Sequence, residues 1–219
     1  MQYNYFNTSN NTRSEIPAMY NACFLSVDYQ YDFAGDNGIA RVVGDSPRFI
    51  ENELVPFLRT HGIGVHEIIS DYRLPRGKSN NEACVPGTIG YQSLLPDDLR
   101  VGDVHVKCMH NPIWVRENIG VPNSDLGKEY QDPELFDLWV AQHFPNKSIP
   151  IVIFGETIEC CVLSTAQELY FRGYDIYILY EATDPMQERQ ALKDVIATNS
   201  TLSIYAKTIH FSELSEHYG

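Results

Sequence analysis

Residues 150–161 read PIVIFGETIECC, and this stretch decides the fold. In it a proline precedes four consecutive apolar residues, and a glycine follows them. A short, fully apolar run of this kind is typical of a central parallel strand, which is buried on both faces. The next residues, 160–172, have a helical pattern that Gly173 ends. The stretch therefore predicts a buried strand, a turn and a helix, the repeating elements of an α/β sheet.

Short apolar runs alternate with longer helical patterns from residue 22 to the end of the chain, which is typical of βαβ units and a parallel sheet. Ser46 is the expected N-cap of the first helix, with Pro47 at its first helical position. Six strands with helices between them predict a three-layer α/β/α fold around a mostly parallel six-stranded sheet. We expect strands at residues 22–27, 64–70, 103–107, 151–154, 175–180 and 203–207, and helices at residues 46–62, 133–144, 160–172 and 186–197.

The chain of 219 residues is long enough for one well-buried domain and short for two. We expect a single domain over residues 16–219. Residues 1–15, MQYNYFNTSNNTRSE, are too polar to bury much surface, and we expect a flexible arm there. This segment lacks the layout of a signal peptide, and no apolar run approaches the roughly 20 residues that span a bilayer. The sequence therefore predicts a cytoplasmic protein that makes no contact with membranes.

Cysteine usage and net charge exclude several classes of protein. The five cysteines show no Cys-x-x-Cys spacing, and their odd number argues against a disulfide framework and a structural zinc site. The 16 basic and 29 acidic residues give a formal charge of −13, without a visible basic patch. Such a chain repels a phosphate backbone, so nucleic acid is not an expected partner.

Three reactive side chains are expected at one edge of the predicted sheet. Asp28 ends the first strand, Lys107 ends the third, and Cys161 lies at the start of the helix after the fourth. Sheets of this type bind ligands at the carboxyl ends of their strands. A carboxylate beside a thiol can act as its general base, and a helix N-terminus stabilises a thiolate. Each residue alone also fits a structural role. Asp28 fits a turn cap, Lys107 an ordinary lysine at a strand end, and Cys161 a buried apolar thiol.

Taken together, the motifs resemble those of the isochorismatase-like, or nicotinamidase-related, hydrolases from about residue 23 to residue 211. SVDYQYDF (26–33) resembles the first-strand motif of that family. CVPGTIG (84–90) followed by DVHVK (103–107) resembles the segment that leads to its catalytic lysine. GETIECCVLSTAQELYFRGYDIYIL (155–179) resembles its cysteine motif.

The resemblance implies a catalytic set of Asp28, Lys107 and Cys161. It also implies a cis peptide bond between Glu156 and Thr157, and an oxyanion hole made by the backbone N–H groups of Thr157 and Cys161. The implied activity is hydrolysis of the C–N bond of a small amide or ureide through an acyl thioester, with release of ammonia or an amine. Family members commonly assemble, so we expect a homo-oligomer. No cofactor is expected.

The sequence departs from the family pattern at two places. Members that resemble nicotinamidases carry a metal site built from Asp-x-His and a second histidine, whereas residues 71–73 here read Asp-Tyr-Arg. We therefore expect no metal. Ile158 and Glu159 stand where many members have Thr-Asp. True isochorismatases, which cleave a vinyl ether, lack the nucleophilic cysteine, so Cys161 favours C–N bond hydrolysis.

The substrate pocket is the least defined part of the sequence. By position, we expect Gln30, His110 and Trp114 to contact the substrate, although each also fits a packing role. The loop after the second expected strand carries three basic residues, Arg73, Arg76 and Lys78. They form either a cationic mouth, an entrance that attracts an anionic substrate, or an ordinary solvated loop. Two other functions stay open, a cysteine hydrolase that acts on esters or other small substrates and a catalytically idle binding subunit.

Overall fold

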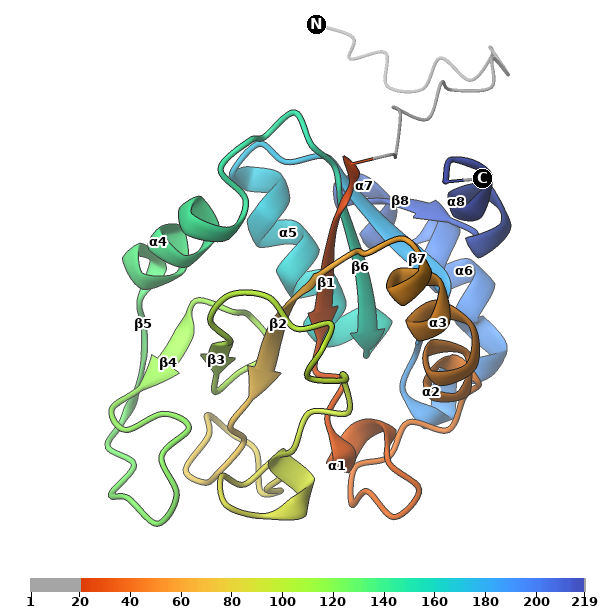
Figure 1. Cartoon of the computed structure of the whole chain (residues 1–219). Coiled ribbons are helices and arrows are strands. Elements are labelled where there is room, and N and C mark those ends of the chain that lie inside the picture. Colours follow the sequence, from red (N-terminus) through yellow and green to blue (C-terminus); the bar gives the residue numbers. More distant parts are fainter. Residues whose placement is uncertain (1–20, 219) are drawn as a thin grey trace, which may run out of the picture.

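The computed structural model describes residues 21–218, without the side chains of residues 187–189 and 199. A six-stranded sheet runs through the middle of the molecule, and helices cover both of its faces (Figure 1). The predicted three-layer α/β/α fold is therefore confirmed. The arm expected at residues 1–15 lies outside the described residues.

All neighbouring strands of the sheet are parallel, in the order β3-β2-β1-β6-β7-β8. The strand predicted from the apolar run before Gly155 lies at the centre, between β1 and β7, and all of its residues are buried. The strands are β1 (Cys23–Val27), β2 (Val65–Ser70), β3 (His105–Lys107), β6 (Ile151–Glu156), β7 (Ile176–Asp184) and β8 (Lys207–Ile209).

Two apolar cores hold the helices against the sheet. Helices α4, α5, α6 and α7 contribute to the core on one face, and the segment α2–η2–α3 together with α8 contributes to the core on the other. The helical elements are α2 (Ser46–Phe49), η2 (Ile50–Leu54), α3 (Val55–Thr60), α4 (Pro133–His143), η4 (Ile158–Val162), α5 (Leu163–Phe171), η5 (Gln187–Leu192), α6 (Lys193–Asn199), α7 (Leu202–Tyr205) and α8 (Phe211–Glu216). Of these, η2 and η4 are π-helical and η5 is a 3₁₀ helix.

Two sequence predictions of local structure are wrong. The last strand, expected at residues 203–207, begins only at Lys207, because Leu202 packs into the core as part of a short helix while Ile204 stays 62% exposed. The expected N-cap Ser46 makes no capping bond, and Asp45 holds the N-cap position. The Ser46 hydroxyl instead donates to the buried carboxyl of Glu156 at 2.5 Å.

Several short elements that the sequence did not reveal surround the carboxyl ends of the strands. In Figure 1 the arrowheads of β1, β2 and β6 point down, toward α1 and the loops that follow β2. A small antiparallel hairpin packs beside β3. These additional elements are α1 (Tyr31–Ala34), η3 (Ile89–Tyr91), β4 (Trp114–Arg116) and β5 (Glu129–Gln131).

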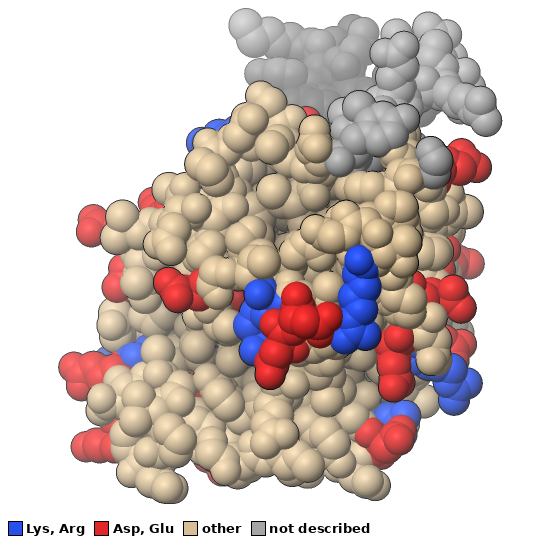
Figure 2. Space-filling model, in the orientation of Figure 1, with Lys and Arg blue, Asp and Glu red and all other residues tan. Residues whose placement is uncertain are grey.

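The structure shows how the charged side chains are arranged on one face and whether the cysteines are joined by disulfides. On the face shown in Figure 2, basic side chains stand next to acidic ones and form no continuous patch. Within residues 21–218, no helix combines the length and apolar character needed to cross a membrane. All five cysteines belong to this described part, and no disulfide joins any of them.

Gly155, at the carboxyl end of β6, is required by close packing as well as by its backbone conformation. Its φ is +116°, and a Cβ atom there would lie 2.0 Å from the carbonyl oxygen of Val27 on β1. We predict that Gly155→Ala lowers the free energy of unfolding by about 3 kcal/mol or more, since strain and overpacking combine. Chemical denaturation measures the change.

Gly62 is the matched control for this prediction. It also has a positive φ, +64°, but no atom lies within 4 Å of the position of its Cβ. Gly62→Ala should therefore cost only about 1 kcal/mol, the strain of the left-handed conformation alone. Equal destabilisation by the two substitutions would contradict the packing argument.

Candidate active site

Lys107 is the centre of a buried polar cluster at the carboxyl ends of β1, β2 and β3. Its ammonium Nζ donates to Asp28 Oδ2 at 2.7 Å, to Ser70 Oγ at 2.7 Å and to the Tyr72 hydroxyl at 3.0 Å. Asp28, Ser70 and Lys107 are fully buried. An ammonium group has three N–H donors, so these three acceptors satisfy all of them. The cluster therefore keeps a charge in the interior without an unpaired donor.

Asp28 is fixed by the ends of two neighbouring strands. Its backbone N–H donates to Ile68 O on β2, and its φ of +55° is rare for residues other than glycine. The Ser70 hydroxyl donates to Asp28 Oδ1 at 2.9 Å, while Lys107 occupies Oδ2. Both carboxylate oxygens therefore have a defined partner, and the carboxylate is held in one orientation.

Cys161, in η4, joins this cluster through Tyr72. Its Sγ lies 3.1 Å from the Tyr72 hydroxyl, which is also bonded to Lys107. Burial raises the pKa of the Tyr72 phenol well above its ordinary value, so its O–H stays protonated. The structure thus brings together the three residues expected to be catalytic, Asp28, Lys107 and Cys161, and adds Tyr72 as the group between the ammonium and the sulfur.

The charges of this cluster set the protonation of the thiol. Burial raises the pKa of Cys161 to about 12, and the negative charge of Asp28 adds to the rise, while Lys107 opposes it. For Lys107, burial acts to lower the pKa, but the negative charge and the hydrogen bond of Asp28, with further support from Cys161, outweigh it, and the pKa lies above its ordinary value. The resting thiol is therefore protonated, and the expected stabilisation of a thiolate by the helix N-terminus does not dominate.

The turn between β6 and η4 carries the proposed oxyanion donors. The peptide bond between Glu156 and Thr157 is cis, at the position that the family resemblance implies. Thr157 follows Glu156, the last residue of β6, which pairs with Asp184 on β7. At this turn the Glu159 carboxylate accepts from the backbone N–H of Met186 at 3.1 Å, and Ile158 is fully buried. A polar contact at this turn is therefore kept despite the unusual Ile-Glu pair.

A cavity of about 430 Å³ borders Cys161 and Thr157. Of the three expected substrate contacts, only His110 lines it. Cys160 also borders this cavity, but the contact with the Tyr72 hydroxyl belongs to Cys161. The remaining lining residues come mainly from the loops after β1 and β2: Phe33, Ile39, Ala40, Arg41, Val42, Tyr72, Asn81, Glu156 and Met186.

The structure corrects the expected roles of Gln30 and Trp114. Gln30 is fully buried, and its side-chain amide bonds to the backbone of Ser70 at both its N–H and its C=O and to the carbonyl of Tyr91. It therefore holds β1 and β2 together rather than facing the cavity. Trp114 lies on β4, paired with Gln131, and does not line the cavity that borders Cys161.

The residues at the implied metal position do not fit a metal ion. Asp71, the aspartate of the Asp-Tyr-Arg sequence, accepts hydrogen bonds from the Arg73 guanidinium at 2.5 and 2.7 Å. Both side chains are buried, so a fixed cation already neutralises this carboxylate. Within the described residues, no group of three or more His, Cys, Asp and Glu side chains is placed to hold a metal.

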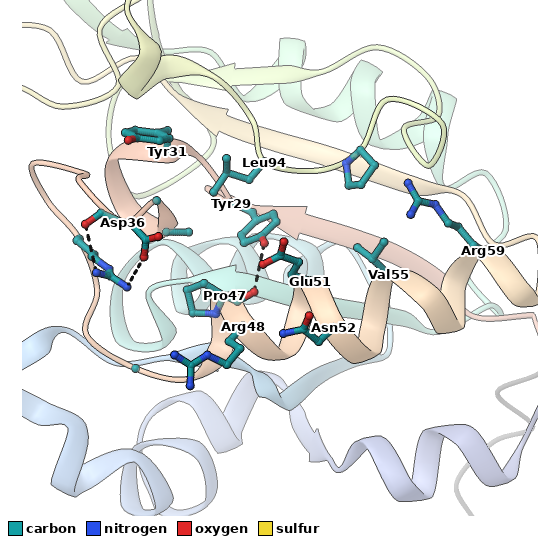
Figure 3. A pocket seen from close by; sticks show the side chains of 15 residues that line it. Tyr29, Tyr31, Asp36, Pro47, Arg48, Glu51, Asn52, Val55, Arg59 and Leu94 are labelled. Atoms are coloured by element: carbon teal, nitrogen blue, oxygen red, sulfur yellow. Dashed lines mark hydrogen bonds and ion pairs between the residues drawn. The ribbon is translucent and has the colours of Figure 1, made fainter.

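A second cavity, of about 630 Å³, is lined by the loop that follows α1 and by the segment α2–η2–α3 (Figure 3). It is lined by Tyr29, Glu51 and Arg48 among others, and it contains neither Asp28, Lys107 nor Cys161. Arg41 borders both cavities, and its guanidinium is paired with Asp36 at 3.1 Å. Of Asp28, Lys107 and Cys161, it is Cys161 that borders the smaller cavity, which is therefore the candidate active site.

Solved structures with the same fold are isochorismatase-like proteins. A hydrolase of this type from Alkaliphilus metalliredigens aligns at 18% identity over 91% of this chain and 99% of its own, with a TM-score of 0.61. A pyrazinamidase from Pyrococcus horikoshii, solved in complex with zinc, aligns at 19% identity over 87% and 99%, with a TM-score of 0.57. An N-carbamoylsarcosine amidase from Thermoplasma acidophilum aligns at 14% identity over 87% and 96%, with a TM-score of 0.55.

These similarities show that the chain has the isochorismatase-like fold. Comparisons of the sequence with protein-family models and with curated proteins gave no match.

The raised pKa of the thiol predicts how Cys161 reacts with iodoacetamide. Because the pKa is about 12, the alkylation rate should rise about tenfold per pH unit between about pH 7 and 9, without a plateau. The Tyr72 hydroxyl acts to lower this pKa, so Tyr72→Phe should slow alkylation at each pH. Peptide mass spectrometry in a Cys160→Ala background reports Cys161 alone. A plateau near neutral pH, or faster alkylation of Tyr72→Phe, would show that the protonation argument is wrong.

Proposed function

We propose that this protein is a cysteine-dependent amidohydrolase that cleaves the C–N bond of a small amide or ureide. The observation that carries the proposal is the buried cluster in which Lys107 bonds to both Asp28 and Tyr72, and Tyr72 touches Cys161. Cys161 and Tyr72 border the cavity, and hydrogen bonds link them to the fully buried Lys107 ammonium and Asp28 carboxylate. This combination supports nucleophilic catalysis with general acid–base assistance.

In the first step Asp28 accepts the thiol proton while Sγ of Cys161 attacks the carbonyl carbon of the substrate. A thiol with a raised pKa is a strong nucleophile once deprotonated, so transfer of its proton during the attack suits this site. Lys107 compensates the negative charge shared by Asp28 and sulfur, and the Tyr72 O–H is placed to donate to the sulfur. The products of the attack are a C–S bond and an oxyanion.

The backbone N–H groups of Thr157 and Cys161 are the proposed donors to that oxyanion. Thr157 and Cys161 both border the cavity. Donors fixed before the reaction stabilise charge that develops in the transition state. When the tetrahedral intermediate collapses, Asp28 returns its proton to the leaving nitrogen, and ammonia or an amine departs from an acyl thioester.

Hydrolysis of the thioester completes the cycle. Water attacks the acyl carbon, Asp28 accepts a proton from it, and the released acid leaves Cys161 as a protonated thiol. Every proton passes through one carboxylate, which the Ser70 and Lys107 hydrogen bonds hold in place. The structural neighbours support a small-amide substrate class, since they include a pyrazinamidase and an N-carbamoylsarcosine amidase.

A substrate panel tests the proposal. We expect ammonia release from at least one of four classes: nicotinamide, carbamoyl-amino acids, ureidoacrylate-like acids and biuret-like ureides. Aryl esters in the same panel distinguish an amidase from an esterase. An enzyme that cleaves the esters and none of the C–N substrates would overturn the proposal.

The adjacent cysteines offer a matched pair of variants. We predict that Cys161→Ala abolishes turnover, because it removes the sulfur that contacts Tyr72. Cys160→Ala should retain most of the activity, since the sulfur that contacts Tyr72 stays in place. Ammonia release measures both. Full activity of Cys161→Ala, or loss of activity confined to Cys160→Ala, would show that the wrong sulfur is assigned.

A further inference from the structure

Arg76 lies over the ring of the tyrosine that touches the candidate nucleophile. Its guanidinium carbon is 3.9 Å from the centroid of the Tyr72 ring. It lines an outer cavity of about 760 Å³, which is adjacent to the cavity at Cys161. The two cavities share six lining residues, and the zone that these residues border is called the passage: Phe33, Ile39, Ala40, Tyr72, Asn81 and His110.

Among the cations near this passage, Arg76 is the one without a carboxylate partner among the described side chains. Arg73 is paired with Asp71, and Arg41 is paired with Asp36. Glu82 also borders the outer cavity, but its carboxylate accepts from the backbone N–H of Leu74 at 2.9 Å. The Arg76 guanidinium therefore makes no ion pair within the described part of the chain.

The hydrogen-bond donors of Arg76 are only partly used. A guanidinium carries five N–H donors. Nη2 donates to Ser79 Oγ at 3.0 Å and more weakly to Asn81 O at 3.4 Å. Nε is buried and has no partner among the described residues. The guanidinium therefore keeps N–H donors that no described residue uses, and those that face the cavity are available to a ligand oxygen.

The side chain of Tyr72 sets the distance between the two ends of the passage. Its hydroxyl contacts the sulfur of Cys161, and its ring face carries the Arg76 guanidinium. A small molecule whose carbonyl carbon is at the sulfur therefore needs only a short spacer to reach the guanidinium. Arginine suits a carboxylate at that point, because its planar donor pairs match the two carboxylate oxygens.

We propose that the substrate carries a carboxylate, separated by a short spacer from the scissile amide or ureide carbonyl, and that Arg76 binds this carboxylate. The proposal rests on the proposed amidohydrolase function and names its substrate class. It assigns to Arg76 one of the two roles that the sequence left open, a cationic mouth rather than a solvated loop.

Matched pairs of amides test the proposal by binding, without the need for turnover. Succinamate, glutaramate and adipamate are compared with butanamide, pentanamide and hexanamide, which have the same chain lengths without the carboxylate. Calorimetry measures each affinity for the Cys161→Ala protein, alone and combined with Arg76→Gln or Lys78→Gln. Lys78 is an exposed cation of the same loop that lines neither cavity, so its substitution controls for net charge.

At one chain length or more, the acid should bind about 10- to 100-fold more tightly than its neutral partner, as expected for a charged hydrogen-bonded pair. Arg76→Gln should remove this preference and leave the affinity for the neutral amide unchanged, and Lys78→Gln should keep the preference. No preference at any length, or a preference that survives Arg76→Gln, overturns the inference.

Different measurements test the two proposals: ammonia release tests the amidohydrolase function, and the preference for acids in binding tests the role of Arg76. Ammonia release by the wild-type protein without any preference for the acids would leave the amidohydrolase standing and remove the role of Arg76. An Arg76-dependent preference in binding, with no release of ammonia from any amide or ureide, would remove the amidohydrolase and keep Arg76 as a carboxylate-binding residue.

Discussion

The buried ammonium of Lys107 is the constraint on which the rest of the site depends. An ammonium removed from water costs several kcal/mol unless a counter-ion and hydrogen bonds replace its hydration. Asp28, Ser70 and Tyr72 supply that replacement from the ends of β1 and β2, and each of them gains a fixed position in return. The same contacts place a carboxylate and a phenol beside Cys161. The contacts that neutralise the charge of Lys107 are therefore the same contacts that arrange the candidate reacting groups.

The parts of the fold that could be predicted from the sequence are those whose burial leaves a clear pattern. The strand Ile151–Phe154 was predictable because it is apolar at every position and bounded by proline and glycine, as a strand buried on both faces requires. The hairpin β4–β5 was not, since its strands have three residues each and lie far apart in the chain. Residues 203–207 alternate in a way that suits a strand, but Leu202 is buried in a helix and the strand starts later.

The candidate catalytic set followed from strand ends and from the resemblance, whereas its supporting groups depend on contacts between distant segments. Gln30 was expected at the substrate, yet its amide bonds backbone groups 40 and 61 residues away, which no local pattern encodes. Tyr72 was not predicted, because the family pattern assigns residues 71–73 to a metal site and gives the tyrosine no role there. A signal did exist: Ser70 and Tyr72 are two residues apart at a strand end, so their side chains point the same way, toward the lysine on the neighbouring strand.

The central claim is that this cluster makes the sulfur of Cys161 the group that carries the acyl intermediate. The most direct measurement is the mass of the intact protein quenched in acid during turnover, followed by peptide mapping of the modified site. The account predicts an added mass equal to the acyl part of the substrate, located on Cys161, and its disappearance once the substrate is consumed. An adduct on any other residue, or sustained ammonia release with no covalent adduct at the earliest times, would contradict it.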